Sequence, residues 1–142
     1  MKIPFPLKTA VIDDNRTILK LIEVMLDDEN ELEVEYFDNP NDALEAIKNN
    51  QIQLVITDIN MPDLCGDILV RKIMDLRLGI DIIVMTGGIS LIDAYACFKA
   101  GAKEIVFKPI DKISFISSIN ESIEKYKKWN HVLEHIIKEK NL

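Results

Sequence analysis

Carboxylate, hydroxyl and ammonium side chains stand directly after four short apolar runs of this sequence. Continuous apolar runs of this length, set between helix-like segments, are typical of buried strands in a parallel sheet. The ligand site of such a sheet lies beyond the carboxyl ends of its strands. The runs and the residues after them are Ala10–Ile12 with Asp13 and Asp14, Leu54–Thr57 with Asp58, Ile82–Met85 with Thr86, and Ile105–Phe107 with Lys108. We therefore expect these five side chains to meet at one edge of the sheet.

Three carboxylates in one pocket repel one another, so at least one takes up a proton unless a cation lies between them. Their hard oxygen atoms, with room for water, suit Mg²⁺. We expect Lys108 to pair with Asp58, because a cation and an ammonium group around one carboxylate leave a place for a phosphoryl group. Asp58 can then act as a nucleophile and form an acyl phosphate. Such a transfer needs mainly in-line positioning and neutralised charge, and the hydroxyl of Thr86 can donate to a phosphoryl oxygen.

Strand-like and helix-like segments alternate along the chain and predict five β-α units. Asp14 or Asn15 can cap the first helix, Pro40 suits the first turn of the second, and Gly101 can close the fourth. Because crossover connections are right-handed, we expect an open sheet with helices on both faces. The predicted helices are Ile18–Leu26, Pro40–Ile47, Asp67–Arg77, Ser90–Ala100 and one from Lys112 onward, and Val34–Phe37 is an additional edge strand.

The helical pattern near the C-terminus continues past the length that a sheet needs for cover. Apolar residues recur from Ile113 to Ile137, so the last helix could run for about 25 residues. A few turns should extend beyond the core and carry apolar residues that need a partner. Trp129, the only tryptophan, is either an anchor for a second subunit or another partner, or it folds back on its own domain.

Length and composition indicate one folded domain. The 142 residues can bury most of the surface that the unfolded chain exposes, and 48% hydrophobic with 29% charged residues excludes disorder of the whole. The net charge of −7 argues against direct binding of nucleic acid through phosphate contacts. No export signal or membrane-spanning run is visible, so we expect a cytoplasmic location and no membrane partner.

As a set, the polar residues at the strand ends make the chain resemble the CheY-like receiver domain of two-component response regulators, over about residues 7–125. The resemblance implies a flavodoxin-like α/β fold with strand order 2-1-3-4-5. Together with the helical pattern of the tail, this predicts a receiver domain over residues 1–125 and a C-terminal helical extension over residues 126–142. The matching positions are Asp13-Asp14, Asp58 within Thr57-Asp58-Ile59-Asn60-Met61-Pro62, Gly66, Thr86-Gly87 and Lys108-Pro109.

A phosphorylation-dependent signalling switch is the function that this resemblance implies. Asp58 would accept a phosphoryl group from the histidine of a sensor kinase or of a phosphotransfer protein, Lys108 would hold that group, and Thr86 would be the switch hydroxyl. The protein would signal by a conformational change to a protein partner that the sequence does not identify, and could form a homodimer through its last helix. It would not be an enzyme beyond its own phosphoryl acceptance and slow autodephosphorylation, and its tail is too short for a DNA-binding fold.

The resemblance implies a Mg²⁺ site made of oxygen ligands. Asp14 and Asp58 would bind the ion directly, together with the backbone carbonyl of Asn60. Asp13 would act largely through water.

One position departs from the family pattern. The family often has Tyr or Phe three residues before the lysine, where this chain has Ile105. Coupling between the threonine and an aromatic ring therefore cannot be the output signal. We expect phosphorylation to reshape the Gly87-Gly88 loop and the start of the following helix instead.

A Mg²⁺-dependent phosphatase of the haloacid dehalogenase type is the alternative, because it also uses an aspartate nucleophile. Such enzymes carry the nucleophile on the first strand as D-x-D, whereas Asp13 is followed by Asp14 and Asn15. They also need a cap or a larger body to hold the substrate.

Overall fold

Five parallel strands form the middle layer of the structure, a computed structural model that describes residues 1–141. The strands are β1 (Leu7–Ile12), β2 (Leu32–Phe37), β3 (Leu54–Asp58), β4 (Asp81–Thr86) and β5 (Glu104–Phe107). They lie in the order β2-β1-β3-β4-β5, and every neighbouring pair is parallel. The predicted flavodoxin-like strand order is therefore confirmed. The order reverses between β1 and β3, and folds of this type bind ligands at the carboxyl ends of such a pair.

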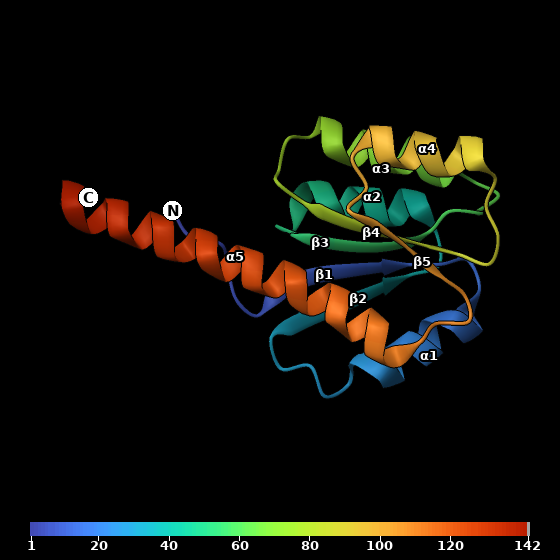
Figure 1. The fold of residues 1–142 in the computed structure, drawn as a ribbon, viewed down its shortest axis with the longest axis horizontal. Coiled ribbons are helices and arrows are strands. Elements are labelled where there is room, and N and C mark those ends of the chain that lie inside the picture. The colour runs from blue at the N-terminus through green and yellow to red at the C-terminus, as the bar shows by residue number, and fades with distance from the viewer. Residues whose placement is uncertain (142) are drawn as a thin grey trace.

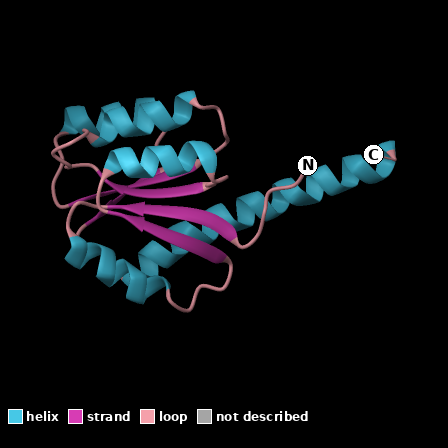
Figure 2. Ribbon diagram, turned by 180° about the vertical axis from the view of Figure 1, so that it is seen from behind, coloured by secondary structure: helices cyan, strands magenta, loops and turns pink. Residues whose placement is uncertain are grey.

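Helices cover both faces of the sheet, as expected (Figures 1 and 2). The helices α1 (Arg16–Leu26) and α5 (Lys112–Lys140) lie on one face, and α2 (Pro40–Asn49), α3 (Gly66–Asp75) and α4 (Leu91–Ala100) lie on the other. The long α5 crosses the sheet and projects beyond it, on the side away from the carboxyl ends of the strands (Figure 1). Within residues 1–141, no helix is long and apolar enough to cross a membrane.

Local sequence signals explain where several helices begin and end. Asn15 caps α1, because its side chain accepts a hydrogen bond from a backbone N–H of the first turn. Of the two predicted caps, Asn15 therefore takes this role, and Asp14 does not. Asn39 caps α2, which begins with Pro40 as predicted. Gly101 ends α4 with a φ of 109°, a left-handed conformation that favours glycine.

The sheet separates two apolar cores. Phe115 of α5 is fully buried in the core on the α1 and α5 side, and residues such as Val55 and Ile82 face the core under α2, α3 and α4. The strands β3 and β4 are buried along their whole length, since each has a strand on both sides and helices on both faces. This burial explains why their sequences are continuous apolar runs. The edge strand β2 is only half-buried, as its alternating pattern predicts.

The ends of some elements differ from the prediction. The strand β1 begins at Leu7 rather than Ala10, because strand pairing with β2 uses the backbone and tolerates the polar side chains of Lys8 and Thr9. The helix α3 ends at Asp75, and Arg77 has a left-handed φ of 55°. The helix α5 is unbroken over 29 residues, slightly longer than predicted.

Substitution of Gly66 should destabilise the fold. A Cβ atom at Gly66 would lie 2.5 Å from both Cα and Cγ1 of Ile59, a distance at which the backbone must shift. We expect Gly66→Ala to lower the free energy of unfolding by about 1–3 kcal/mol. Gly88→Ala is the matched control, because no atom lies within 4 Å of its added Cβ. Urea unfolding would measure both, and equal stability of the two variants would contradict the prediction.

Candidate functional site

Three aspartate side chains gather at the carboxyl ends of β1 and β3. One carboxylate oxygen each of Asp13, Asp14 and Asp58 lies within 4.8 Å of the others. The cause is strand pairing, because Ile12 and Thr57 are partners in the register of β1 and β3 and the aspartates follow them directly. Asp13 and Asp58 are 1% and 4% exposed, whereas Asp14 is open to solvent. The predicted acidic cluster is therefore present, with two buried carboxylates and one exposed carboxylate.

Lys108 places its ammonium group between two of these carboxylates. Its Nζ atom lies 3.0 Å from Oδ1 of Asp58 and 2.8 Å from Oδ2 of Asp13. The side chain reaches over the end of β4, which separates β5 from β3 in the sheet. Its backbone N–H donates to the carbonyl of Thr86 at 2.7 Å and holds the ends of β4 and β5 together. The structure thus contains the expected ion pair of Lys108 with Asp58, and it shows a second ion pair of Lys108 with Asp13.

Burial and charge both shift the ionisation of this cluster. Burial raises the pKa of Asp58, and the negative charges of Asp13 and Asp14 raise it further, although the hydrogen bond from Lys108 opposes them. Burial alone would lower the pKa of Lys108. Its hydrogen bonds to Asp13 and Asp58 outweigh that cost, so its pKa lies above the ordinary value. The lysine therefore stays charged, while the surroundings of Asp58 disfavour its ionised form.

The donor set fits a divalent cation. Three carboxylates and one ammonium group leave a surplus of two negative charges when all are ionised. Carboxylate oxygens with an open side to water are the ligands that Mg²⁺ takes, because it retains several water molecules. The exposed Asp14 leaves that side open. Asp13, Asp14 and Asp58 therefore suit Mg²⁺ by their chemistry and spacing.

Thr86 lies at the same edge, at the end of β4, but its hydroxyl contacts its own loop. The hydroxyl donates to the carbonyl oxygen of Gly88 at 2.9 Å and accepts from the N–H of Gly88 at 3.1 Å. The side-chain amide of Asn60 donates to the same Gly88 carbonyl at 3.4 Å. The sequence did not indicate this contact, because a hydrogen bond to a loop carbonyl leaves no residue pattern. The loop after β4 is thus held by two side chains that belong to the candidate site.

A comparison with protein-family models matches residues 9–120 to the response regulator receiver domain. The chain is also 31% identical to the regulatory protein VanR of Enterococcus faecium, over 89% of this chain and 54% of that protein. It is 31% identical to the transcriptional regulatory protein FlgR of Helicobacter pylori, over 93% of this chain and 34% of that protein. The chain therefore spans about half or less of the length of these relatives.

Solved structures have the same fold. A CheY-like response regulator receiver domain protein from Methanospirillum hungatei JF-1 matches with a TM-score of 0.81 and 30% identity, over 86% of this chain and 97% of that one. A response regulator receiver domain protein from Clostridium thermocellum matches with a TM-score of 0.78 and 33% identity, over 87% and 98% of the two chains. The haloacid dehalogenase alternative receives no support from these comparisons. By its family match, its sheet order and its acidic cluster with Lys108, the chain belongs to the receiver domains of two-component response regulators.

Proposed function

We propose that Asp58 accepts a phosphoryl group from a phosphohistidine of a sensor kinase or phosphotransfer protein in the cytoplasm. The observation that carries this proposal is the position of Lys108, whose Nζ bridges the buried carboxylates of Asp13 and Asp58 beside the exposed Asp14. A buried carboxylate with a neighbouring ammonium group and an open side is suited to attack a phosphorus atom and to retain the charged product.

The residues of this cluster carry the bond-forming step. A carboxylate oxygen of Asp58 attacks phosphorus, the bond between phosphorus and the donor nitrogen breaks, and the imidazole leaves with the electron pair. The product is a mixed anhydride of carboxylate and phosphate. Lys108 would move its hydrogen bond from the Asp58 oxygen to a phosphoryl oxygen while it keeps Asp13. Mg²⁺, when bound, neutralises charge on the phosphoryl oxygens, and Asp13, Asp14, Asp58 and the backbone carbonyl of Asn60 would hold it.

The response should begin in the loop after β4. To donate to a phosphoryl oxygen, the hydroxyl of Thr86 must give up the carbonyl of Gly88, which leaves Asn60 as the remaining side-chain donor to that carbonyl. Because Ile105 cannot act as an aromatic partner, the backbone of the loop carries the change. We expect beryllofluoride, a phosphoryl mimic, to shift the backbone amide resonances from Gly87 to Leu91. Unchanged resonances in a protein that binds the mimic would contradict this prediction.

Phosphorylation itself is the test of the proposal. Incubation with acetyl phosphate and Mg²⁺, followed by intact mass measurement, should show a gain of one phosphate, and EDTA should prevent it. The same protein should not release phosphate catalytically from a panel of small phosphate esters, because the proposed role is a switch that signals to a downstream protein. Catalytic release from the esters, without a phosphorylated protein, would overturn the proposal in favour of a phosphatase.

A second copy of this chain is the proposed partner of the projecting part of α5. Trp129, Val132 and Ile136 are about half exposed and lie on one side of the helix at spacings of three and four residues, as in a coiled-coil seam. Replacement of Trp129 and Ile136 by Ser should convert a dimer into a monomer in sedimentation velocity. Val24→Ser is the control, because Val24 is a more exposed apolar residue on α1. A monomeric wild-type protein at all concentrations would overturn this proposal.

A further inference from the structure

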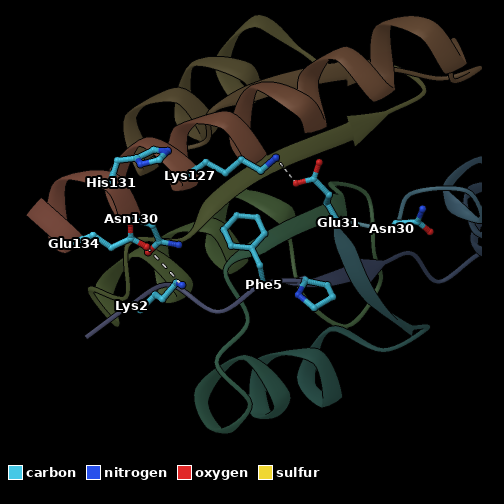
Figure 3. Close-up of a pocket in the computed structure, with 9 residues that line it drawn as sticks. Lys2, Phe5, Asn30, Glu31, Lys127, Asn130, His131 and Glu134 are labelled. Atoms are coloured by element: carbon cyan, nitrogen blue, oxygen red, sulfur yellow. Dashed lines mark ion pairs between the residues drawn. The ribbon is translucent and has the colours of Figure 1, made fainter.

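The first six residues of the chain lie beside the second half of α5, and Asn130 joins the two segments (Figures 1 and 3). The N–H of Ile3 donates to Oδ1 of Asn130 at 2.8 Å, and Nδ2 of Asn130 donates to the carbonyl of Ile3 at 2.9 Å. One side-chain amide therefore satisfies both backbone groups of one residue. These residues are 127 positions apart in the sequence.

The setting of Asn130 indicates that this contact is its role. Asparagine is a weak helix former, yet Asn130 lies inside an unbroken helix and is only 7% exposed. Pro4 restricts the preceding Ile3 to extended conformations. A restricted Ile3 loses less backbone freedom when it binds the amide of Asn130.

The other contacts of residues 1–6 are apolar packing and one exposed ion pair. Ile3 and Phe5 pack at the edge of the core that contains Ile123 and Tyr126. A cavity of about 390 Å³, lined by Phe5, Asn130 and other side chains, lies between the segment and the helix (Figure 3). The ion pair between Lys2 and Glu134, with 3.6 Å between Nζ and Oε1, is exposed and contributes little. The amide of Asn130 is therefore the main directed contact between the two segments.

Asn130 is also the last buried residue of α5 within the described part of the chain. One turn earlier, the hydroxyl of Tyr126 donates to the carbonyls of Gly79 at 2.6 Å and Gln53 at 3.1 Å, and so ties α5 to the sheet and its loops. From Trp129 onward, the helix carries the exposed side chains of Trp129, Val132 and Ile136. A contact that orients these exposed side chains relative to the receiver body must therefore lie near Asn130.

We infer that residues 1–6 and Asn130 form an N-terminal latch that sets the direction of the projecting part of α5. With the latch closed, the helix up to Asn130 moves with the receiver body, and the exposed side of α5 is presented at a constant angle to it. With the latch open, the last buried residue that anchors α5 is Tyr126. The ion pair of Lys127 with Glu31 is exposed and contributes little, so the helix beyond Tyr126 can bend and fray. Asn130 is thus a positioning residue for the projecting part of α5, and it acts through residues 1–6.

Hydrogen exchange of three variants tests this inference. We expect Asn130→Ala to speed exchange of the amides at residues 127–138 by roughly tenfold, because two hydrogen bonds that oppose local opening are lost. Deletion of residues 1–5 removes the same two hydrogen bonds, together with the packing of Ile3 and Phe5 and the Lys2–Glu134 ion pair. It should speed exchange at residues 127–138 by at least as much, and adding Asn130→Ala to the deletion should give no further increase, because the deletion has already removed the partner of Asn130. Asn120→Ala is the matched control, an exposed asparagine on the same helix. Fluorescence anisotropy of Trp129 should fall in the latch variants and not in the control.

The outcomes separate a latch from a merely stabilising residue. In Asn130→Ala, a latch gives faster exchange confined to the end of α5, with exchange in β3 and β4 unchanged. Uniformly faster exchange in β3, β4 and α5 of this variant would overturn the inference, because it would report a loss of global stability alone. Equal exchange in Asn130→Ala and Asn120→Ala would also overturn it, as would additive effects of the substitution and the deletion.

Discussion

An Asp58→Asn variant should gain no phosphate from acetyl phosphate and Mg²⁺, whereas the wild-type protein should gain one. Asparagine keeps the shape of the side chain and can still accept the hydrogen bond from Lys108, but it has no carboxylate oxygen that can form a mixed anhydride. The expected effect is complete loss, measured by intact mass. A phosphate gain in the variant equal to that of the wild type would show that another residue is the acceptor.

Two measurements show that this loss is chemical. Asp63→Asn is the matched control, an exposed aspartate in the loop that follows β3 whose carboxylate accepts a hydrogen bond from Asn39, and it should be phosphorylated normally. The folded-state pKa of Asp58 is raised, so its favourable contribution to stability is present at low pH and is lost as the pH rises through that pKa. Removal of its negative charge should therefore raise the thermal unfolding midpoint at neutral pH in EDTA. A lower midpoint would contradict this account of the site.

Lys108→Ala should slow phosphorylation by acetyl phosphate by about two orders of magnitude at saturating Mg²⁺. The substitution removes the ammonium group that lies 3.0 Å from Asp58 and 2.8 Å from Asp13, so charge that develops on the phosphoryl group loses one of its neutralising partners. The variant also leaves two buried carboxylates without their lysine. Its thermal unfolding midpoint in EDTA should therefore be below that of the wild type.

Two further lysine substitutions, one nearby and one that conserves the charge, serve as controls for this prediction. Lys112→Ala removes an exposed lysine at the start of α5 and should leave the rate unchanged. Lys108→Arg keeps the charge with a different shape, so it should recover part of the stability but not the full rate. The time course of the phosphorylated mass gives the rate for each variant. A Lys108→Ala rate within a factor of two of the wild type would show that the lysine has no part in the transfer.

The residue types at the strand ends were readable from the sequence because burial leaves a simple pattern. A strand with neighbours on both sides and helices on both faces is largely apolar, so β3 and β4 contain the apolar runs Leu54–Ile56 and Ile82–Met85, and polar residues follow each run at the carboxyl end of its strand. Helix signals such as Asn39-Pro40 and Gly101 are equally local, since each acts on the backbone of its own turn. Pattern and local chemistry together predicted that Asp13, Asp14, Asp58 and Lys108 meet, whereas the hydroxyl of Thr86 lies at the same edge and contacts its own loop.

The sequence left open how those side chains are paired. The bridge of Lys108 to Asp13 depends on the pairing of β1 with β3 and on the path of one side chain over the end of β4. The hydroxyl of Thr86 donates to the carbonyl oxygen of Gly88. Every residue has a backbone carbonyl, so the sequence does not indicate which one accepts this hydrogen bond. Such choices depend on distances between groups that only the folded chain brings together.

The end of α5 likewise combines a feature that the sequence predicts with a contact that only the structure shows. Its helical pattern and its exposed apolar residues follow from the spacing of residues along one helix, so the sequence by itself determined that a long helix would project from the domain. Its contact with the start of the chain could not be foreseen, because Asn130 binds the backbone of Ile3 and not a particular side chain. A hydrogen bond to the backbone places no demand on residue type. Only the tertiary structure therefore decided which segment lies against the second half of α5.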